Sequence, residues 1–126
     1  MPSENERLSM PTEEQTHLAA ETFRMLADPT RIKVLWALEQ GESSVARLAE
    51  IAGAGPTAVS QHLAKLRLAG IVRGRREGTF VYYSLADGHV ATLLAEALQH
   101  AEHTDRELPR DGEHRHQLTK AARRQG

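Results

Sequence analysis

Apolar residues recur at helical spacing in five segments of the chain, and residues that favour helix ends separate these segments. In the first segment we expect Leu18, Phe23 and Leu26 to face the interior of the protein. Asp28 and Pro29 are typical of the start of a second helix, because the Asp28 carboxylate can accept backbone N–H groups and proline needs no donor there. The predicted helices span residues 13–27, 29–40, a short segment from Ser43 or Ser44 to Ile51, 56–69 and 87–103.

The spacing changes after Ile71, where apolar and polar residues no longer follow a helix. Residues 71–75 and 80–85 are rich in β-branched and aromatic side chains, and the polar residues 76–79 between them are typical of a turn. This pattern predicts a β-hairpin that follows two helices joined by the glycine-rich turn 52–55. The order of helix, turn, helix and hairpin is that of a winged helix-turn-helix protein, which is mainly α with a small β-hairpin.

Length and composition limit the function further. The 126 residues suffice for one domain, which we predict to cover residues 13–103, between flexible tails at residues 1–12 and 104–126. No apolar run is long enough to cross a bilayer, and the first residues lack the features of a signal peptide, so we expect a cytoplasmic protein without a membrane partner. Because the chain has no cysteine, any metal must bind to nitrogen and oxygen atoms.

The fourth predicted helix has one apolar and one polar face, which suits a helix that enters the major groove of DNA. Thr57 and Gln61 lie on its exposed face and Ser60 on its flank, near the helix N-terminus. Short polar side chains there can reach the edges of the bases. Lys65 and Arg67 lie at the far end of the helix and are better placed to bind phosphates.

A basic hairpin follows this helix. Arg73, Arg75 and Arg76 lie near its turn, where guanidinium groups suit a wing that binds the DNA backbone or minor groove. The chain has a net charge of −1, yet residues 56–76 contain five basic residues and no acidic one. His62 projects beside the apolar face of the preceding helix, where a packed histidine or a phosphate contact is favoured over base readout.

Four runs of this sequence resemble the ArsR/SmtB family of metal-responsive winged-helix repressors: LADPTRIKVLWAL, VARLAEIAG, VSQHLAKLRLAGIV and GRREGTFVYYSL. The resemblance covers residues 26–103. It implies a homodimer formed through the first and last helices, binding to a pseudo-palindromic operator in double-stranded DNA, and control by an inducer. In the matching motif, Ser60, Gln61 and His62 would be the residues that read the DNA.

The last predicted helix carries four residues of the types that bind transition metals: Asp87, His89, His100 and His103. His100 and His103 lie one turn apart and can bind one ion together. His89 precedes His100 by eleven residues, which is ~16 Å along a helix and too far for both to hold the same ion. Two antiparallel copies of the helix would instead bring Asp87 and His89 of one subunit to His100 and His103 of the other, twice per symmetric dimer. Family members that sense metal at their last helix resemble this pattern.

Without thiolate ligands, zinc, cobalt and nickel remain as metals for this site. We favour Ni(II) or Co(II) slightly over Zn(II), because the tail adds His114 and His116 and family members that sense nickel or cobalt have extra C-terminal histidines. The resemblance also implies that metal binding releases the repressor from DNA. One alternative stays open, a winged-helix regulator controlled by a non-metal ligand or partner. The chain lacks an H-E-x-x-H metalloprotease motif, and we do not expect an enzyme.

Overall fold

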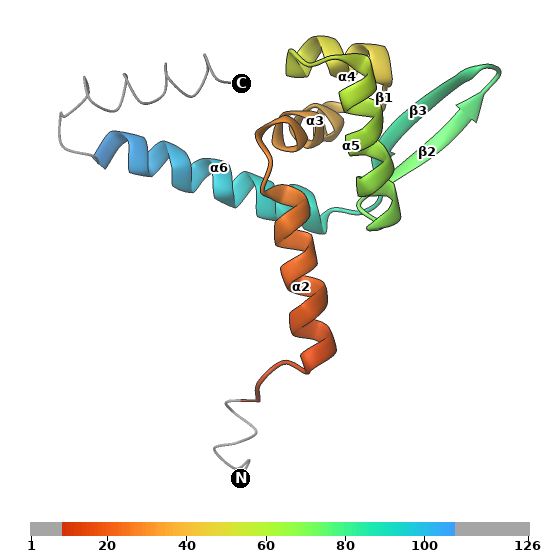
Figure 1. Cartoon of the computed structure of the whole chain (residues 1–126). Coiled ribbons are helices and arrows are strands. Elements are labelled where there is room, and N and C mark those ends of the chain that lie inside the picture. Colours follow the sequence, from red (N-terminus) through yellow and green to blue (C-terminus); the bar gives the residue numbers. More distant parts are fainter. Residues whose placement is uncertain (1–8, 108–126) are drawn as a thin grey trace. The chain divides into compact units, whose positions relative to one another are not determined.

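The computed structural model describes residues 9–107, which form five helices and one small sheet (Figure 1). Contacts between residues divide the chain into two units, Met1–Leu94 and Ala95–Gly126, and each is described separately. The helices are α2 (Glu13–Leu26), α3 (Pro29–Gln40), α4 (Val45–Ala52), α5 (Pro56–Leu68) and α6 (His89–Glu107), and the strands are β1 (Ser43–Ser44), β2 (Val72–Glu77) and β3 (Phe80–Leu85). The fold is therefore mainly α with a small β-hairpin, as predicted.

Local hydrogen bonds explain where the helices begin. Thr12 Oγ1 accepts the backbone N–H of Gln15 at 3.1 Å, and Gln15 Oε1 accepts that of Thr12 at 2.9 Å, which forms a capping box at α2. At α3 the Asp28 carboxylate accepts the N–H of Arg31 at 3.0 Å and a proline occupies the first helical position, as predicted. Ser44, one of the two predicted caps, caps α4.

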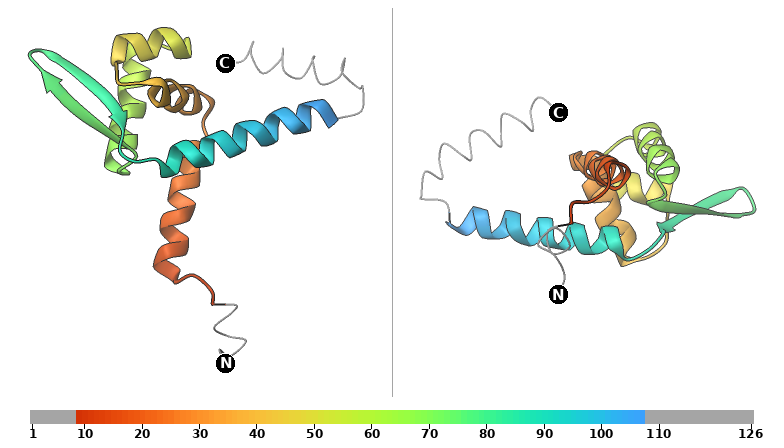
Figure 2. Two further views of the ribbon diagram at one scale, coloured as in Figure 1. Left: turned by 180° about the vertical axis from the view of Figure 1, so that it is seen from behind. Right: turned by 90° about the horizontal axis from the view of Figure 1, so that it is seen from below.

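A glycine turn joins α4 to α5, as the sequence predicts. Gly53 ends α4 in the left-handed conformation, with φ 64° and ψ 37°, which a residue without Cβ adopts at little cost. The chain then turns sharply, so that α5 crosses beside α4 and α3, and the hairpin β2–β3 extends away from these three helices in every view (Figures 1 and 2). This arrangement is a winged helix-turn-helix.

The sheet contains one strand that the sequence pattern did not predict. Its order is β1-β3-β2 with antiparallel neighbours, so β3 is central and β2 lies at an edge. The predicted hairpin β2–β3 is present, and its turn is shorter than predicted, with Gly78 at φ 63°. The additional strand β1 pairs Ser43 with Tyr83 and Ser44 with Tyr82. Two residues are too few to show an alternating pattern, which is why β1 was not predicted.

The hydrophobic core of the first unit lies between α3, α4 and α5 and extends to β2 and the first turns of α6. Each of these elements contributes apolar side chains that are at most 8% exposed. This packing fixes α5 and the base of the wing relative to α3 and α4. The larger buried side chains are Val34, Leu35, Leu38, Leu48, Val59, Leu63, Leu66, Ile71, Val72, Val90 and Leu94.

Helix α2 differs from the prediction in what it buries. Leu18 and Phe23 are 59% and 60% exposed, so the expectation that they face the interior is wrong for a single chain. The reason is that α2 reaches the core only through its last turn, where Met25 and Leu26 pack against it. Leu93 on α6 is also partly uncovered, at 39% exposed. The single chain therefore leaves apolar surface on both α2 and α6.

Helix α6 has different limits from those predicted. It begins at His89 instead of residue 87 and continues to Glu107, four residues beyond the predicted end. Asp87 precedes it and its Oδ1 atom accepts the backbone N–H of His89 at 2.9 Å. The predicted domain limits at residues 13 and 103 stay a prediction. Among the helices of residues 9–107, none combines the length and the apolar character that a membrane span requires.

Candidate nucleic-acid interface and metal-ligand residues

Helix α5 is held to the core by one face and exposes the other. Its inner face consists of three apolar side chains that solvent does not reach: Val59, Leu63 and Leu66. Thr57, Ser60 and Gln61 are exposed near the start of the helix, where we predicted base readout. The buried face holds α5 to the core, so these polar side chains lie on the protein surface.

The far end of α5 is basic and lies against the wing. Lys65 and Arg67 occupy the last turn of the helix and are exposed. A Cβ atom on Gly74 of β2 would lie 3.4 Å from Arg67 Nη1, so this guanidinium lies next to the backbone of the wing. The basic end of α5 therefore lies next to strand β2 of the wing.

His62 lies on α5 but faces the start of α3. Its Nδ1 atom accepts the Nε–H of Arg31 at 3.0 Å, and its Nε2 atom lies 3.8 Å from Asp28 Oδ1. The side chain is only 20% exposed. The pKa of Asp28 is lowered, chiefly because its carboxylate accepts the backbone N–H of Arg31, and secondarily by the charges of His62 and Arg31 against an opposing effect of burial. These contacts favour a packed histidine over a base-reading one.

Arg75 makes more contacts than the wing prediction anticipated. Its Nε and Nη2 atoms lie 3.2 and 2.6 Å from the two carboxylate oxygens of Glu42, and its Nη1 atom lies 2.9 Å from Glu77 Oε2. The guanidinium carbon is also 5.2 Å from the centre of the Tyr82 ring, within the range of a cation–π contact. Hydrogen bonds with the two carboxylates raise the pKa of Arg75, and its guanidinium lowers the pKa of Glu42.

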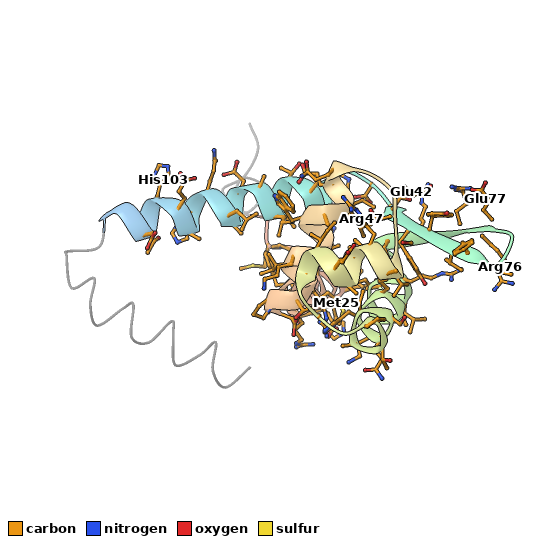
Figure 3. The ribbon with its side chains drawn as sticks, turned by 90° about the horizontal axis from the view of Figure 1, so that it is seen from above. Met25, Glu42, Arg47, Arg76, Glu77 and His103 are labelled. Carbon is orange, nitrogen blue, oxygen red and sulfur yellow. The ribbon has the colours of Figure 1, made fainter. Side chains whose placement is uncertain are left out.

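The other two wing arginines are free to contact a ligand. Arg73 and Arg76 are exposed, and within residues 9–107 neither side chain has a hydrogen bond or ion pair. Figure 3 shows Arg76 and Glu77 near the tip of the hairpin. The wing therefore presents two unpaired guanidinium groups and a third that two carboxylates hold.

The predicted metal ligands fall into two pairs, one in each unit. Asp87 and His89 belong to the first unit, and the Asp87 carboxylate accepts the backbone N–H of His89, as described above. His100 and His103 belong to the second unit and lie one turn apart on α6, where Figure 3 marks His103. His100 Nε2 lies 3.5 Å from Thr104 Oγ1. All four predicted ligands are exposed.

A single chain does not assemble a complete metal site in its described part. Within residues 9–107, no three side chains of the ligand types are close enough to hold one ion. The tail histidines His114 and His116 lie outside the described residues. A complete shell from Asp87, His89, His100 and His103 thus stays a prediction that requires two chains.

A hollow of about 350 Å³ lies between α2 and the start of α6 within the first unit. Its lining is mostly apolar and includes Phe23, Ile71 and Leu93, and it also includes Asp87 and His89. One pair of predicted ligands therefore lies beside the exposed apolar surface of α2.

Two residues of this region were not identified from the sequence, Arg31 and Glu42. Arg31 contacts His62 across 31 positions, and Glu42 contacts Arg75 across 33 positions. No local pattern signals such long-range partners.

Known proteins match both the sequence and the fold. The family model described as "Bacterial regulatory protein, arsR family" matches residues 28–73. The HTH-type transcriptional regulator KmtR of Mycobacterium tuberculosis is 50% identical over 98 residues, which are 78% of this chain and 75% of the relative. The cadmium resistance transcriptional regulatory protein CadC homolog of Staphylococcus aureus is 40% identical, over 64% of this chain and 68% of the relative.

The fold also matches a solved structure. The homodimeric winged helix-turn-helix DNA-binding domain of a Mycobacterium bovis protein superposes with a TM-score of 0.65 and 32% identity. The superposition covers 80% of this chain and 88% of that one. The likeness thus extends well beyond the helix-turn-helix.

Proposed function

This chain belongs to the ArsR family of bacterial regulatory proteins, and we propose that it is a metal-responsive repressor that binds operator DNA as a homodimer. Members of this family are transcriptional regulators, and the chain has their winged helix-turn-helix. The observation that carries the proposal is the exposed polar face of α5 beside an arginine-rich wing. Metal bound by the last helices would release the DNA.

DNA recognition would divide between α5 and the wing. Thr57, Ser60 and Gln61 are exposed on the first turns of α5, where side chains can form hydrogen bonds with base edges in the major groove. Phosphates of the DNA backbone would be bound by the basic residues Lys65, Arg67, Arg73 and Arg76, with a smaller contribution from Arg75. Such contacts position the protein and make binding depend on salt.

The exposed apolar surface supports a dimer formed through the first and last helices. Leu18, Phe23 and Leu93 are large apolar side chains that a monomer would leave in water. In a symmetric dimer the same surface of each subunit faces the other, so these residues would be covered by the equivalent surface of the second subunit. The similar Mycobacterium bovis domain is described as homodimeric.

The four predicted ligands fit a divalent metal by their chemistry. Their donor atoms are imidazole nitrogens and carboxylate oxygens on exposed side chains, which suit nickel, cobalt and zinc. Cadmium, for which the Staphylococcus aureus relative is named, favours thiolates, and this chain has no cysteine. We therefore propose a divalent ion bound between Asp87 and His89 of one subunit and His100 and His103 of the other, and we place Ni(II) or Co(II) ahead of Zn(II) because the chain also has His114 and His116.

The position of Asp87 suggests how metal would affect DNA binding. Asp87 and His89 follow directly after β3, which ends at Leu85, and Val90 packs in the same core as α5. A metal ion that binds these residues to the last helix of the partner subunit would restrict the relative motion of the two subunits. The dimer needs that motion to place its two α5 helices in successive major grooves. A ligand shifts such an equilibrium only by its differential affinity for the two states, typically ~1 to 3 kcal/mol.

A DNA-binding titration with and without metal tests this proposal. The operator is first identified by footprinting the metal-free protein on the promoter of its own gene. We expect sequence-specific binding without metal, two metal ions bound per dimer, and ~5- to 150-fold weaker operator binding when nickel, cobalt or zinc is added. Specific DNA binding without stoichiometric metal binding would instead favour control by a non-metal ligand or partner. Equal affinity for operator and random DNA would overturn the proposal that this chain is a repressor.

A further inference from the structure

Three helices meet at the side chain of Arg31. Its Nε–H donates to His62 Nδ1 on α5 at 3.0 Å, and its Nη1 atom lies 3.4 and 3.5 Å from the backbone oxygens of Met25 and Arg24 in the last turn of α2. Its own backbone N–H is bound by the Asp28 cap of α3. Arg31 therefore connects the end of α2, the start of α3 and the middle of α5.

The chemistry of Arg31 fixes the role of the His62 Nδ1 atom. A guanidinium only donates hydrogen bonds and stays charged, so Nδ1 of His62 must present a lone pair. The other ring nitrogen, Nε2, lies 3.8 Å from Asp28 Oδ1. Both ring nitrogens thus lie close to residues at the start of α3, and Nδ1 cannot bind a base without losing its hydrogen bond with Arg31.

His62 directly follows the residues that we expect to read DNA. Ser60 and Gln61 are exposed on the same turn of α5, whereas His62 is mostly covered. Hydrogen bonds to base edges depend steeply on distance and angle, so a small rotation of this turn would weaken them. A contact that prevents that rotation contributes to recognition without touching DNA.

From these contacts, and resting on the proposed function, we propose that His62 is a positioning residue that fixes the DNA-reading helix α5, through Arg31, to the start of α3 and the end of α2. Helix α2 carries the exposed apolar surface proposed for the dimer. Arg31 thus provides a path of two hydrogen-bond steps from the dimer helix to the reading helix.

Substitutions that keep or remove single hydrogen-bonding groups test this role. His62→Asn keeps an acceptor close to the position of Nδ1, and His62→Leu removes it at similar size. Arg31→Met removes the donor, and the double variant Arg31→Met/His62→Leu tests whether both act through one contact. Gln61→Ala, at the neighbouring exposed position, is the matched control for a base-reading residue.

Affinities for operator and random DNA are measured at a temperature where circular dichroism shows each variant folded. We expect His62→Asn to bind the operator within about twofold of the wild type, and His62→Leu and Arg31→Met each to bind it about tenfold more weakly, the loss that one charge-assisted hydrogen bond accounts for. Random DNA should be bound equally by all of them. The double variant should be no weaker than either single variant.

Several results would overturn the positioning role. His62→Asn and His62→Leu could prove equally defective, Arg31→Met could bind the operator like the wild type, or the two losses could add in the double variant. A His62 variant that loses preference at a single base pair, as expected of Gln61→Ala, would identify a base reader. If His62→Leu does not fold, the operator affinities of His62→Asn and Arg31→Met are compared instead, and the positioning role requires that only Arg31→Met binds more weakly. A wild-type protein that does not distinguish operator from random DNA would overturn the proposed function instead.

Discussion

Arg75 of the wing is held by Glu42, whose carboxylate lies 2.6 Å from Nη2 and 3.2 Å from Nε of the guanidinium. Glu42 immediately precedes β1, so the pair ties the wing to the connection between α3 and the sheet. Both side chains are partly exposed, at 52% and 36%, and such ion pairs are weak in water. A DNA phosphate would therefore compete with Glu42 for the same guanidinium.

Replacing Glu42 with glutamine should strengthen binding to DNA of any sequence. The change removes one of the two carboxylate charges that hold Arg75 and leaves Glu77, so Arg75 can neutralise a phosphate more fully and the logarithm of the affinity should fall more steeply with the logarithm of salt, by up to ~0.9 in slope. Fluorescence anisotropy at several salt concentrations measures both quantities. Glu39→Gln, which removes a charge from an exposed carboxylate near the end of α3, is the control. The same gain in both variants would mean that only the net charge matters.

Asp28 should stabilise the fold through its cap on α3. Asp28→Ala should lower the free energy of unfolding by ~1 kcal/mol, whereas Asp28→Asn keeps an acceptor for the Arg31 N–H and should lose less. The pKa of Asp28 is below its ordinary value of 3.8 in the folded chain, so its charge stabilises the fold above that pH and ceases to do so as pH falls through the folded pKa.

Urea denaturation at neutral pH and near pH 3, at one protein concentration, measures this effect. The stability advantage of wild type over Asp28→Asn should shrink at the lower pH. An advantage that stays constant, or grows, would contradict the assignment of the charge to Asp28.

Base readout and phosphate binding should separate by residue. Gln61→Ala should lower discrimination between operator and random DNA by ~1 to 3 kcal/mol, because it removes hydrogen bonds to a base edge. Arg76→Ala should instead weaken binding to both sequences and reduce the salt slope by about 1. Competition binding with both duplexes distinguishes the two effects. If Gln61→Ala weakens binding to both duplexes equally, Gln61 does not read a base.

Mixed dimers test whether the metal site spans two subunits. His100→Ala alone should leave metal-free DNA affinity nearly unchanged and abolish release by metal. A dimer that pairs an Asp87→Ala subunit with a His100→Ala subunit should keep one complete site, because both substitutions then fall in the same site of the two. Calorimetric titration of the mixed dimer should give one ion per dimer, and no bound ion would exclude the shared site.

The tail histidines should change the geometry of a bound cobalt ion if they are ligands. Tetrahedral Co(II) absorbs far more strongly in the visible than octahedral Co(II), so we expect a weak spectrum from the full chain. The double substitution His114→Ala/His116→Ala should convert it to an intense one. An intense spectrum in the unsubstituted protein would remove both histidines from the site.

Elements specified by neighbouring residues were predictable, and contacts between distant residues were not. Helix α3 spans the predicted residues 29–40 because a cap and a proline begin it and a glycine follows it. The pairs Arg31–His62 and Arg75–Glu42 depend on how the helices and the sheet pack. The charge of a residue in the sequence does not indicate which distant residue it contacts. The exposure of Leu18 and Phe23 was not predictable for a related reason, since an apolar pattern indicates a face that is unfavourable in water but not whether the same chain covers it.

The edge position of β2 has a consequence for the protein when no DNA is present. An edge strand offers backbone groups on which a strand of another molecule can add, and this starts aggregation. Four of the six residues of β2 are charged, and three of these are arginines. Two such edges would bring like charges together, which opposes their pairing. We therefore expect the wing arginines to oppose aggregation as well, and a variant in which they are replaced by neutral residues should precipitate at concentrations where the natural chain stays in solution.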